Sequence, residues 1–247
     1  MVEPAPHVPV STARDVLAAV LEAAALHPDR RAWVALDLDG TLFDNRPRTL
    51  TILRGYGLSM RQAAPTLLAA IHGLTLDDLH YSPTHAIEAL GPQLAVHAPD
   101  FMKFWRDRFF TNAFQALDAV EAGAVEFALA LCDAGLGVVY LTGRDRPGMM
   151  AGVMQSLDSH GFPLATAQTQ VVLKPDFLTP DVQFKRNAIA ELKRNGPVVG
   201  LFDNEPGIVN MAIDTVPDIV SVRMCRAFAP DPPLLHAKAR QIKSFQL

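Results

Sequence analysis

The sequence predicts an α/β protein whose core is a doubly wound parallel sheet. Four short apolar runs have the near-continuous hydrophobicity of buried parallel strands, and helical patterns separate them; the runs are 33–38, 136–141, 170–173 and 197–202. Strands that alternate with helices are typical of such sheets. Roughly ninety-five residues separate the first two runs, whereas a parallel crossover needs about a dozen. We therefore expect a small domain inserted after the first strand.

Composition narrows the classes of function. The 247 residues carry a formal charge of -4 and are 49% hydrophobic, which fits one substantial domain and a smaller one. No apolar segment reaches the roughly 18 residues that a membrane span needs, and the first residues lack signal-peptide features, so we expect a cytoplasmic protein. Cys132 and Cys225 are too few for a disulfide framework or structural zinc. The absence of a basic tract argues against nucleic-acid binding, although a small nucleotide ligand stays open.

The chain begins with a segment rich in proline, and we expect residues 1–10 to form a loose arm. Thr12 and Asp15 have the spacing of a capping box, and apolar residues follow at helical intervals toward Pro28. This pattern predicts a helix of about four turns that packs beside the sheet.

The first strand ends in acidic residues. Strand alternation sends Asp37 and Asp39 to the same side, and Gly40 allows a tight turn. Two carboxylates at this position are costly unless a cation or hydrogen-bond donors compensate them. Mg2+ is the usual cation, because it prefers oxygen ligands and often holds a substrate phosphate as well.

The segment from Asp37 to Asp44, which includes Asp39 and Thr41, resembles the first motif of the haloacid dehalogenase superfamily in its phosphatase form. The resemblance implies a Rossmann-like core domain. It also implies that Asp37 is a nucleophile that forms an aspartyl phosphate, and that Asp39 is the general acid and base.

The insertion looks helical. Helices are expected over 58–72, 81–90 and 100–110, the last with Asp100 as its cap. Residues 46–117 resemble the cap domain of the same superfamily, which excludes water and selects the substrate, while 1–45 and 118–247 form the core domain.

Two groups of side chains in the insertion have ordinary structural explanations. Aromatic residues on one helical face are expected in the core of the cap or at its seam, rather than as a substrate wall; they are Phe101, Phe104, Trp105 and Phe109. His80, His85 and His97 lack the spacing of metal ligands.

Asp118 has the position of a second helix cap, and the helix that it predicts ends at Gly135. The next strand leads to Thr142, Gly143 and Arg144, where a hydroxyl and free backbone N–H groups suit an anion. Thr142 resembles the second motif of the superfamily, which implies a hydrogen bond to the phosphoryl oxygen. Gly143 and Arg144 are then candidate substrate-binding residues.

Two lysines compete for the third motif, whose cation balances the nucleophile and the phosphoryl charge. Lys185 lies in the first turn of a helix for which Asp181 is the expected cap, and this is the position that the family commonly uses. Lys174 follows a strand instead and is the alternative, with substrate binding as its other candidate role. We favour Lys185.

The strand 197–202 delivers Asp203, Asn204 and Glu205. This arrangement resembles the fourth motif, in which an acid completes the metal site; Asp203 is the leading ligand. Asn204 stands where a second aspartate is commoner, so Asn204, Glu205 or a water remains open as the further ligand. A last strand is expected at 219–224, and 230–247 has no assigned structure.

Together the motifs predict a Mg2+-dependent phosphatase of a small phosphorylated metabolite. The resemblance implies that Asp37, the backbone carbonyl of Asp39 and Asp203 are metal ligands, with Asn204 as the candidate for a further one, and that Lys185 and Thr142 hold the phosphoryl group. A dehalogenase is disfavoured, because chemistry on carbon halides does not need the acid Asp39.

Other functions of this fold stay open. A phosphomutase differs mainly in how its cap retains the intermediate. The segment 174–203 loosely resembles polynucleotide phosphatases, so a nucleotide or polynucleotide-end phosphatase is an alternative, although the lack of a basic surface argues against a nucleic-acid end. A non-catalytic phospholigand-binding protein is disfavoured by the intact motifs. The substrate, the cap residues that face it and the oligomeric state are not readable from the sequence.

Overall fold

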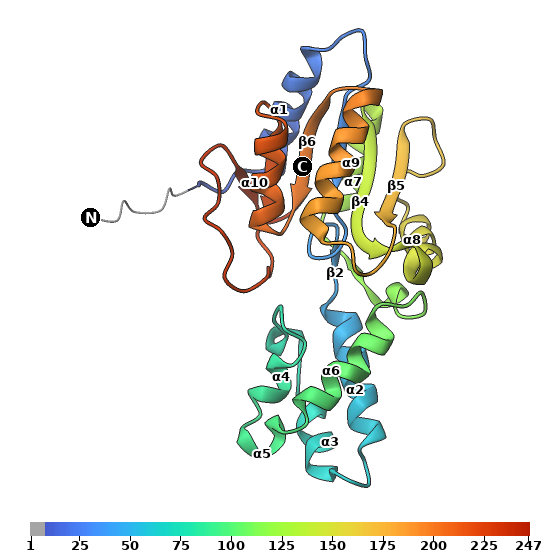
Figure 1. The fold of residues 1–247 in the computed structure, drawn as a ribbon, viewed down its shortest axis with the longest axis vertical. Helices are drawn as coiled ribbons and strands as arrows, with labels where there is room; N and C mark the ends of the chain where they lie inside the picture. The colour runs from blue at the N-terminus through green and yellow to red at the C-terminus, as the bar shows by residue number, and fades with distance from the viewer. Residues whose placement is uncertain (1–7) are drawn as a thin grey trace, which may run out of the picture. The chain divides into compact units, whose positions relative to one another are not determined.

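The computed structural model describes residues 8–247 and contains a six-stranded parallel sheet (Figure 1). The strand order is β5-β4-β1-β6-β7-β8. The bounds are β1 Trp33–Leu36, β4 Gly137–Asp145, β5 Thr169–Lys174, β6 Val198–Asp203, β7 Val220–Met224 and β8 Arg240–Ile242. The predicted doubly wound parallel sheet is confirmed.

The strand order reverses at β1, which lies between β4 and β6. From β1 the chain builds outward through β4 to β5, then returns across β1 to β6 and builds outward on the other side. In open parallel sheets, ligands bind beyond the carboxyl ends of the strands at such a reversal. The topology thus directs attention to the residues that follow β1, β4 and β6.

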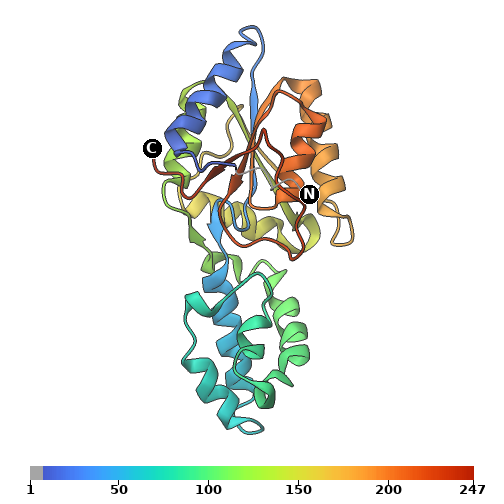
Figure 2. The same cartoon turned by 90° about the vertical axis from the view of Figure 1, so that its left-hand side faces the viewer.

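Helices cover both faces of the sheet (Figure 2). On one face, α1 packs on β6 and β7, and α7 packs on β4; on the other, α9 and α10 cover the sheet from β5 to β7. The bounds are α1 Ala13–Ala25, α7 Ala124–Asp133, α9 Asp181–Asn195 and α10 Pro206–Thr215. The helix α8, Arg146–Ser159, follows β4.

The predicted capping box of α1 is present. The Thr12 hydroxyl accepts a hydrogen bond from the Asp15 N–H, and the Asp15 carboxylate accepts one from the Thr12 N–H. Of the expected loose arm, residues 1–7 lie outside the described residues. Val10 forms a parallel bridge with Gln241.

The described chain divides into two compact units. The sheet unit runs to Phe43 and includes Val120–Pro147 and Leu157–Leu247; the helical unit consists of Asp44–Ala119 and Gly148–Ser156, the middle of α8. Two short paired strands, β2 Phe43–Asp44 and β3 Ala119–Val120, lie where the chain passes from one unit to the other.

The helical unit has a hydrophobic core of its own. Its helices are α2 Arg46–Ser59, α3 Pro65–His72, α4 His85–Glu88, α5 Pro92–Ala95 and α6 Ala98–Phe109, with 3₁₀ turns at Leu76–Asp78 and Gln115–Leu117. Phe101 is fully buried in this core, and Phe104, Trp105 and Phe109 pack against it. These aromatic residues are therefore core residues, as expected.

Several element boundaries differ from expectation. The residue before α6 is His97, so Asp100 lies inside the helix and does not cap it. Asp118 does not cap α7 either, because α7 begins six residues later, after Gly123. Asp118 instead forms a fully buried ion pair with Arg48 at 2.9 Å, within the helical unit. The unassigned terminal segment supplies β8.

No helix among the described residues is long and apolar enough to cross a membrane.

Close packing at the start of β1 predicts a sensitive glycine. Gly137 lies opposite Trp33 in the sheet, and a β-carbon at Gly137 would come within 2.3 Å of the Trp33 ring. Gly137→Ala should therefore lower the free energy of unfolding by roughly 1 to 3 kcal/mol, the usual cost of overpacking. Urea unfolding measures this difference.

Gly207→Ala in α10 is the matched control, because its β-carbon would meet only Pro233 at 3.8 Å. Equal stability of the two variants would mean that the Trp33 ring moves aside freely.

Candidate active site

Asp37 lies directly after β1, with its carboxylate almost completely buried. Its N–H donates to the Phe202 carbonyl at 3.0 Å, which continues the pairing of β1 with β6. Strand alternation sets the direction of the carboxylate. Ala35, two residues earlier, belongs to the core under α9, so Asp37 points to the same side of the sheet.

Lys185 joins the carboxylates that follow β1 and end β6. Its Nζ lies 2.6 Å from Asp37 Oδ1 and 2.6 Å from Asp203 Oδ2, and all three side chains are buried. Lys185 lies on the buried stripe of α9, four residues before Ile189 and seven before Leu192. Helical periodicity therefore aims the lysine at the sheet.

The electrostatics of this cluster are dominated by burial. Burial raises the pKa of Asp37 to about 8; Lys185 opposes the shift, while Asp203 and Asp39 add to it. Burial alone would lower the pKa of Lys185, but the carboxylates of Asp203 and Asp37 raise it above its usual value. The lysine is thus held as a cation, and the Asp37 anion is incompletely compensated.

Asp39, the predicted acid and base, pairs with Arg144. Arg144 Nε donates to Asp39 Oδ2 at 2.9 Å, and Nη2 donates to Oδ1 at 2.7 Å. This is the two-pronged geometry in which a guanidinium fixes the plane of a carboxylate. The Arg144 side chain is 1% exposed, whereas that of Asp39 is 33% exposed.

Two hydroxyls lie at the same end of the sheet. The Thr142 side chain is fully buried, and its Oγ1 accepts the N–H of Arg144 at 3.1 Å. Thr41 Oγ1 donates to Asp37 Oδ2 at 3.3 Å. Sequence reasoning assigned no role to Thr41; its place in the turn four residues after Asp37 was the available signal.

Lys174 belongs to a different cluster from Lys185. Its Nζ forms an ion pair with Asp181 Oδ1 at 2.7 Å. Asp181 also lies against Gly143, where a β-carbon would come within 2.7 Å of Asp181 Oδ2. Asp181 is the first residue of α9, after Pro180, so it does not occupy the expected capping position.

Asn204 and Glu205 bind the loop that follows β7. The Asn204 amide donates to the Ala227 carbonyl at 2.6 Å, and the Glu205 carboxylate accepts the Ala229 N–H at 3.1 Å. Burial raises the pKa of Glu205. Gly40 lies beside Asn204, because a β-carbon on Gly40 would come within 2.8 Å of the amide nitrogen. The first and last acidic segments therefore approach each other closely.

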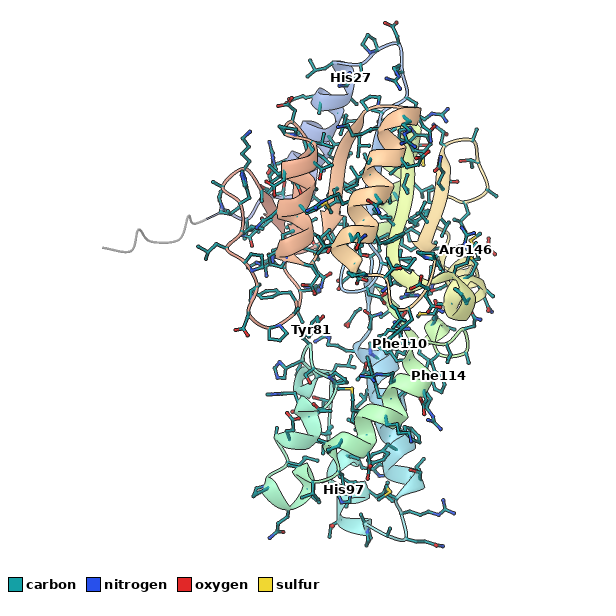
Figure 3. All side chains as sticks on the ribbon, viewed as in Figure 1. His27, Tyr81, His97, Phe110, Phe114 and Arg146 are labelled. Carbon is teal, nitrogen blue, oxygen red and sulfur yellow. The ribbon has the colours of Figure 1, made fainter. Side chains whose placement is uncertain are left out.

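The amino-terminal end of the sheet has a cavity of its own. A cavity of about 420 Å³ there is lined by residues that include His27, Arg30 and Arg31, next to the ends of α1 and α7. In the sheet unit, His27 lies at the opposite end from Arg146, which directly follows β4 (Figure 3). The clustered carboxylates are therefore separate from this cavity.

Comparison with known proteins identifies the fold. No family model matches the chain, and neither does any curated protein sequence. Among solved structures, a haloacid dehalogenase-like family hydrolase from Streptococcus pneumoniae superposes with a TM-score of 0.51 at 12% identity, over 86% of this chain and 93% of that one. The chain has the haloacid dehalogenase-like fold.

Two other structures share it. A predicted phosphatase from Clostridium acetobutylicum has a TM-score of 0.52 at 17% identity, and Protein Tyrosine Kinase A from Mycobacterium tuberculosis has 0.53 at 17% identity. Each match covers 87% of this chain and 94% of the other. Identities this low concern the fold, and the reaction has to be argued from the site.

The residues at the carboxyl end of the six-stranded sheet fit a hard cation such as Mg2+. The available donors are the carboxylates of Asp37 and Asp203, the Asp39 carbonyl and the Asn204 amide oxygen, all of them oxygens. Within residues 8–247, no three His, Cys, Asp or Glu side chains form a metal-binding group. Backbone, amide and water oxygens would therefore have to complete the coordination, as is common for Mg2+.

The raised pKa of Asp37 predicts a pH dependence of stability without divalent cations. Because the folded protein holds this proton more tightly than the unfolded chain, whose Asp37 pKa is near 3.8, stability should fall as pH rises from about 4 to about 8. Asp37→Asn removes the effect and should raise the free energy of unfolding at pH 8 by roughly 1 to 3 kcal/mol, with little gain near pH 4. Urea unfolding with chelator measures this.

The exposed Asp214 of α10 supplies the control, because Asp214→Asn makes the same substitution in a side chain that lies in water. If Asp37→Asn proved less stable than the parent protein at pH 8, the pairing with Lys185 would outweigh the cost of burial.

Proposed function

We propose that the protein is a Mg2+-dependent phosphatase that hydrolyses a phosphomonoester of a small metabolite. The observation that carries this proposal is the buried Lys185 ammonium, 2.6 Å from both Asp37 and Asp203. It gathers a nucleophile, a metal-binding acid and a cation at the carboxyl end of a parallel sheet. Phosphoryl transfer needs these groups, because its catalysis rests on positioning and on neutralising phosphoryl oxygens.

In the proposed first step, an Asp37 carboxylate oxygen attacks phosphorus, and the bond to the leaving oxygen breaks. Asp39 protonates that oxygen. In the second step Asp39 takes a proton from water, whose oxygen attacks the aspartyl phosphate and releases Asp37. Thr41 donates to Asp37 and so helps to orient the nucleophile.

Asp37, the Asp39 carbonyl, Asp203 and Asn204 are the proposed ligands of Mg2+. When bound, the ion supplies positive charge that offsets the phosphoryl oxygens. Lys185 and Thr142 are proposed to hold the same phosphoryl group, with the Gly143 backbone and Lys174 as further substrate contacts. Lys174 would have to exchange its partner Asp181 for the substrate.

We further propose that the helical unit serves as the cap domain. Its main segment is close to the expected cap 46–117, and the expected core domain consists of 1–45 and 118–247. The separate hydrophobic core of the helical unit supports this proposal, since a cap must hold its own shape while it admits substrate.

Hydrolysis of para-nitrophenyl phosphate by the purified protein tests the reaction. Release should require Mg2+, stop with chelator, and fall by at least about 100-fold in Asp37→Asn, because an amide cannot form the aspartyl phosphate. If Asp37→Asn hydrolysed the ester as fast as the parent protein, the nucleophile would be another group.

The two lysines should differ in their kinetic effects. Lys185→Met should lower kcat by about 100-fold or more, since it removes the cation beside the nucleophile. Lys174→Met is the matched control and should act mainly on KM, with kcat within about tenfold, because Lys174 pairs with Asp181 rather than with Asp37. The reverse pattern would transfer the third-motif role to Lys174.

A further inference from the structure

Arg144 has an environment that a substrate-binding arginine would not need. Its side chain is 1% exposed, and two of its N–H groups are directed at the two oxygens of Asp39. Asp39 is the more exposed partner, at 33%. The guanidinium thus lies behind the carboxylate, and a phosphate could reach these N–H groups only by displacing Asp39.

The surroundings of Arg144 hold it in place. Its backbone N–H donates to the buried Thr142 hydroxyl, and its guanidinium carbon lies 5.9 Å from the centre of the Phe43 ring. Phe43 is fully buried and packs against the rings of His160 and Phe162. An arginine supported in this way has few alternative rotamers, so it can impose one orientation on its partner.

We propose that Arg144 is a positioning residue that aims the Asp39 carboxylate, and that it does not bind substrate. The inference rests on the proposed phosphatase function, in which Asp39 acts on the leaving oxygen in one step and on water in the next. Paired N–H donors fix both the position and the plane of a carboxylate. A lysine at this position would fix the position alone, because its ammonium presents a single point charge.

When the leaving group is para-nitrophenolate, the two steps depend unequally on the orientation of the Asp39 carboxylate. In the first step, the bond from Asp37 oxygen to phosphorus forms, and the aryl oxygen departs with its electron pair and needs no proton. In the second step, the water oxygen bonds to phosphorus, the Asp37 oxygen leaves, and a water proton passes to Asp39. If the Asp39 carboxylate loses its fixed orientation, the second step should therefore slow, and the phosphoenzyme should accumulate.

Rapid mixing of the Mg2+-loaded protein with para-nitrophenyl phosphate tests this inference. Arg144→Met and Arg144→Lys should each release a burst of about one para-nitrophenolate per protein, followed by turnover roughly 100-fold slower than in the parent protein. KM should stay the same or fall. A substrate-binding arginine would give the opposite result: no burst, and a raised KM.

A double-mutant cycle with Asp39→Asn separates positioning from general damage to the fold. If Arg144 acts through Asp39, adding Arg144→Met to Asp39→Asn should slow turnover little further. Fully additive losses would overturn the inference, because they would show that Arg144 acts independently of Asp39.

The two proposals fail in different ways. If the parent protein shows no Asp37-dependent release of para-nitrophenolate, the proposed phosphatase function is wrong. If the parent protein is active but the Arg144 variants show a raised KM without a burst, only the positioning role is wrong.

Discussion

The ammonium of Lys185, shared by two buried carboxylates, is the interaction on which the site depends. Asp37 follows β1, and Asp203 ends the neighbouring strand β6 on the same side of the sheet. Without a cation between them, their charges would repel in a poorly hydrated space. The lysine comes from the helix that covers that face. Its presence lets two acids remain together at the end of a hydrophobic sheet, where the proposed mechanism places a phosphate and a divalent cation.

The acidic residues of the site have two different cationic partners. Asp39 is held by Arg144, whereas Asp37 and Asp203 are held by Lys185. Arginine fixes an orientation through two parallel hydrogen bonds, and lysine supplies compact charge. In the proposed mechanism this difference matches the need for a directed proton acceptor at one position and for charge compensation at the other.

Much of the site could be predicted from the sequence, because it lies where local periodicities end. The end of the first apolar run led to Asp37 and Asp39, and the position that the family commonly uses favoured Lys185, which the structure places on the buried face of α9. The bidentate partner of Asp39 was not predicted, because pairing between residues 105 positions apart leaves no local pattern. The prediction that Asp118 caps a helix was wrong for a related reason. A short acidic side chain before a helix has the pattern of a cap, and its buried partner Arg48 is known only from the fold.

The bridge between Val10 and Gln241 has a consequence for how the molecule assembles. The Gln241 side chain also donates to the Val8 carbonyl, a contact between residues 233 positions apart. Closing so long a loop costs more chain entropy than any crossover in the sheet, and it gains little until β7 and β8 are in place. The outer edge of the sheet therefore belongs among the late events of folding. If the bridge between Val10 and Gln241 opened early in unfolding, β8 would have an unpaired edge. Partly unfolded chains associate through such edges.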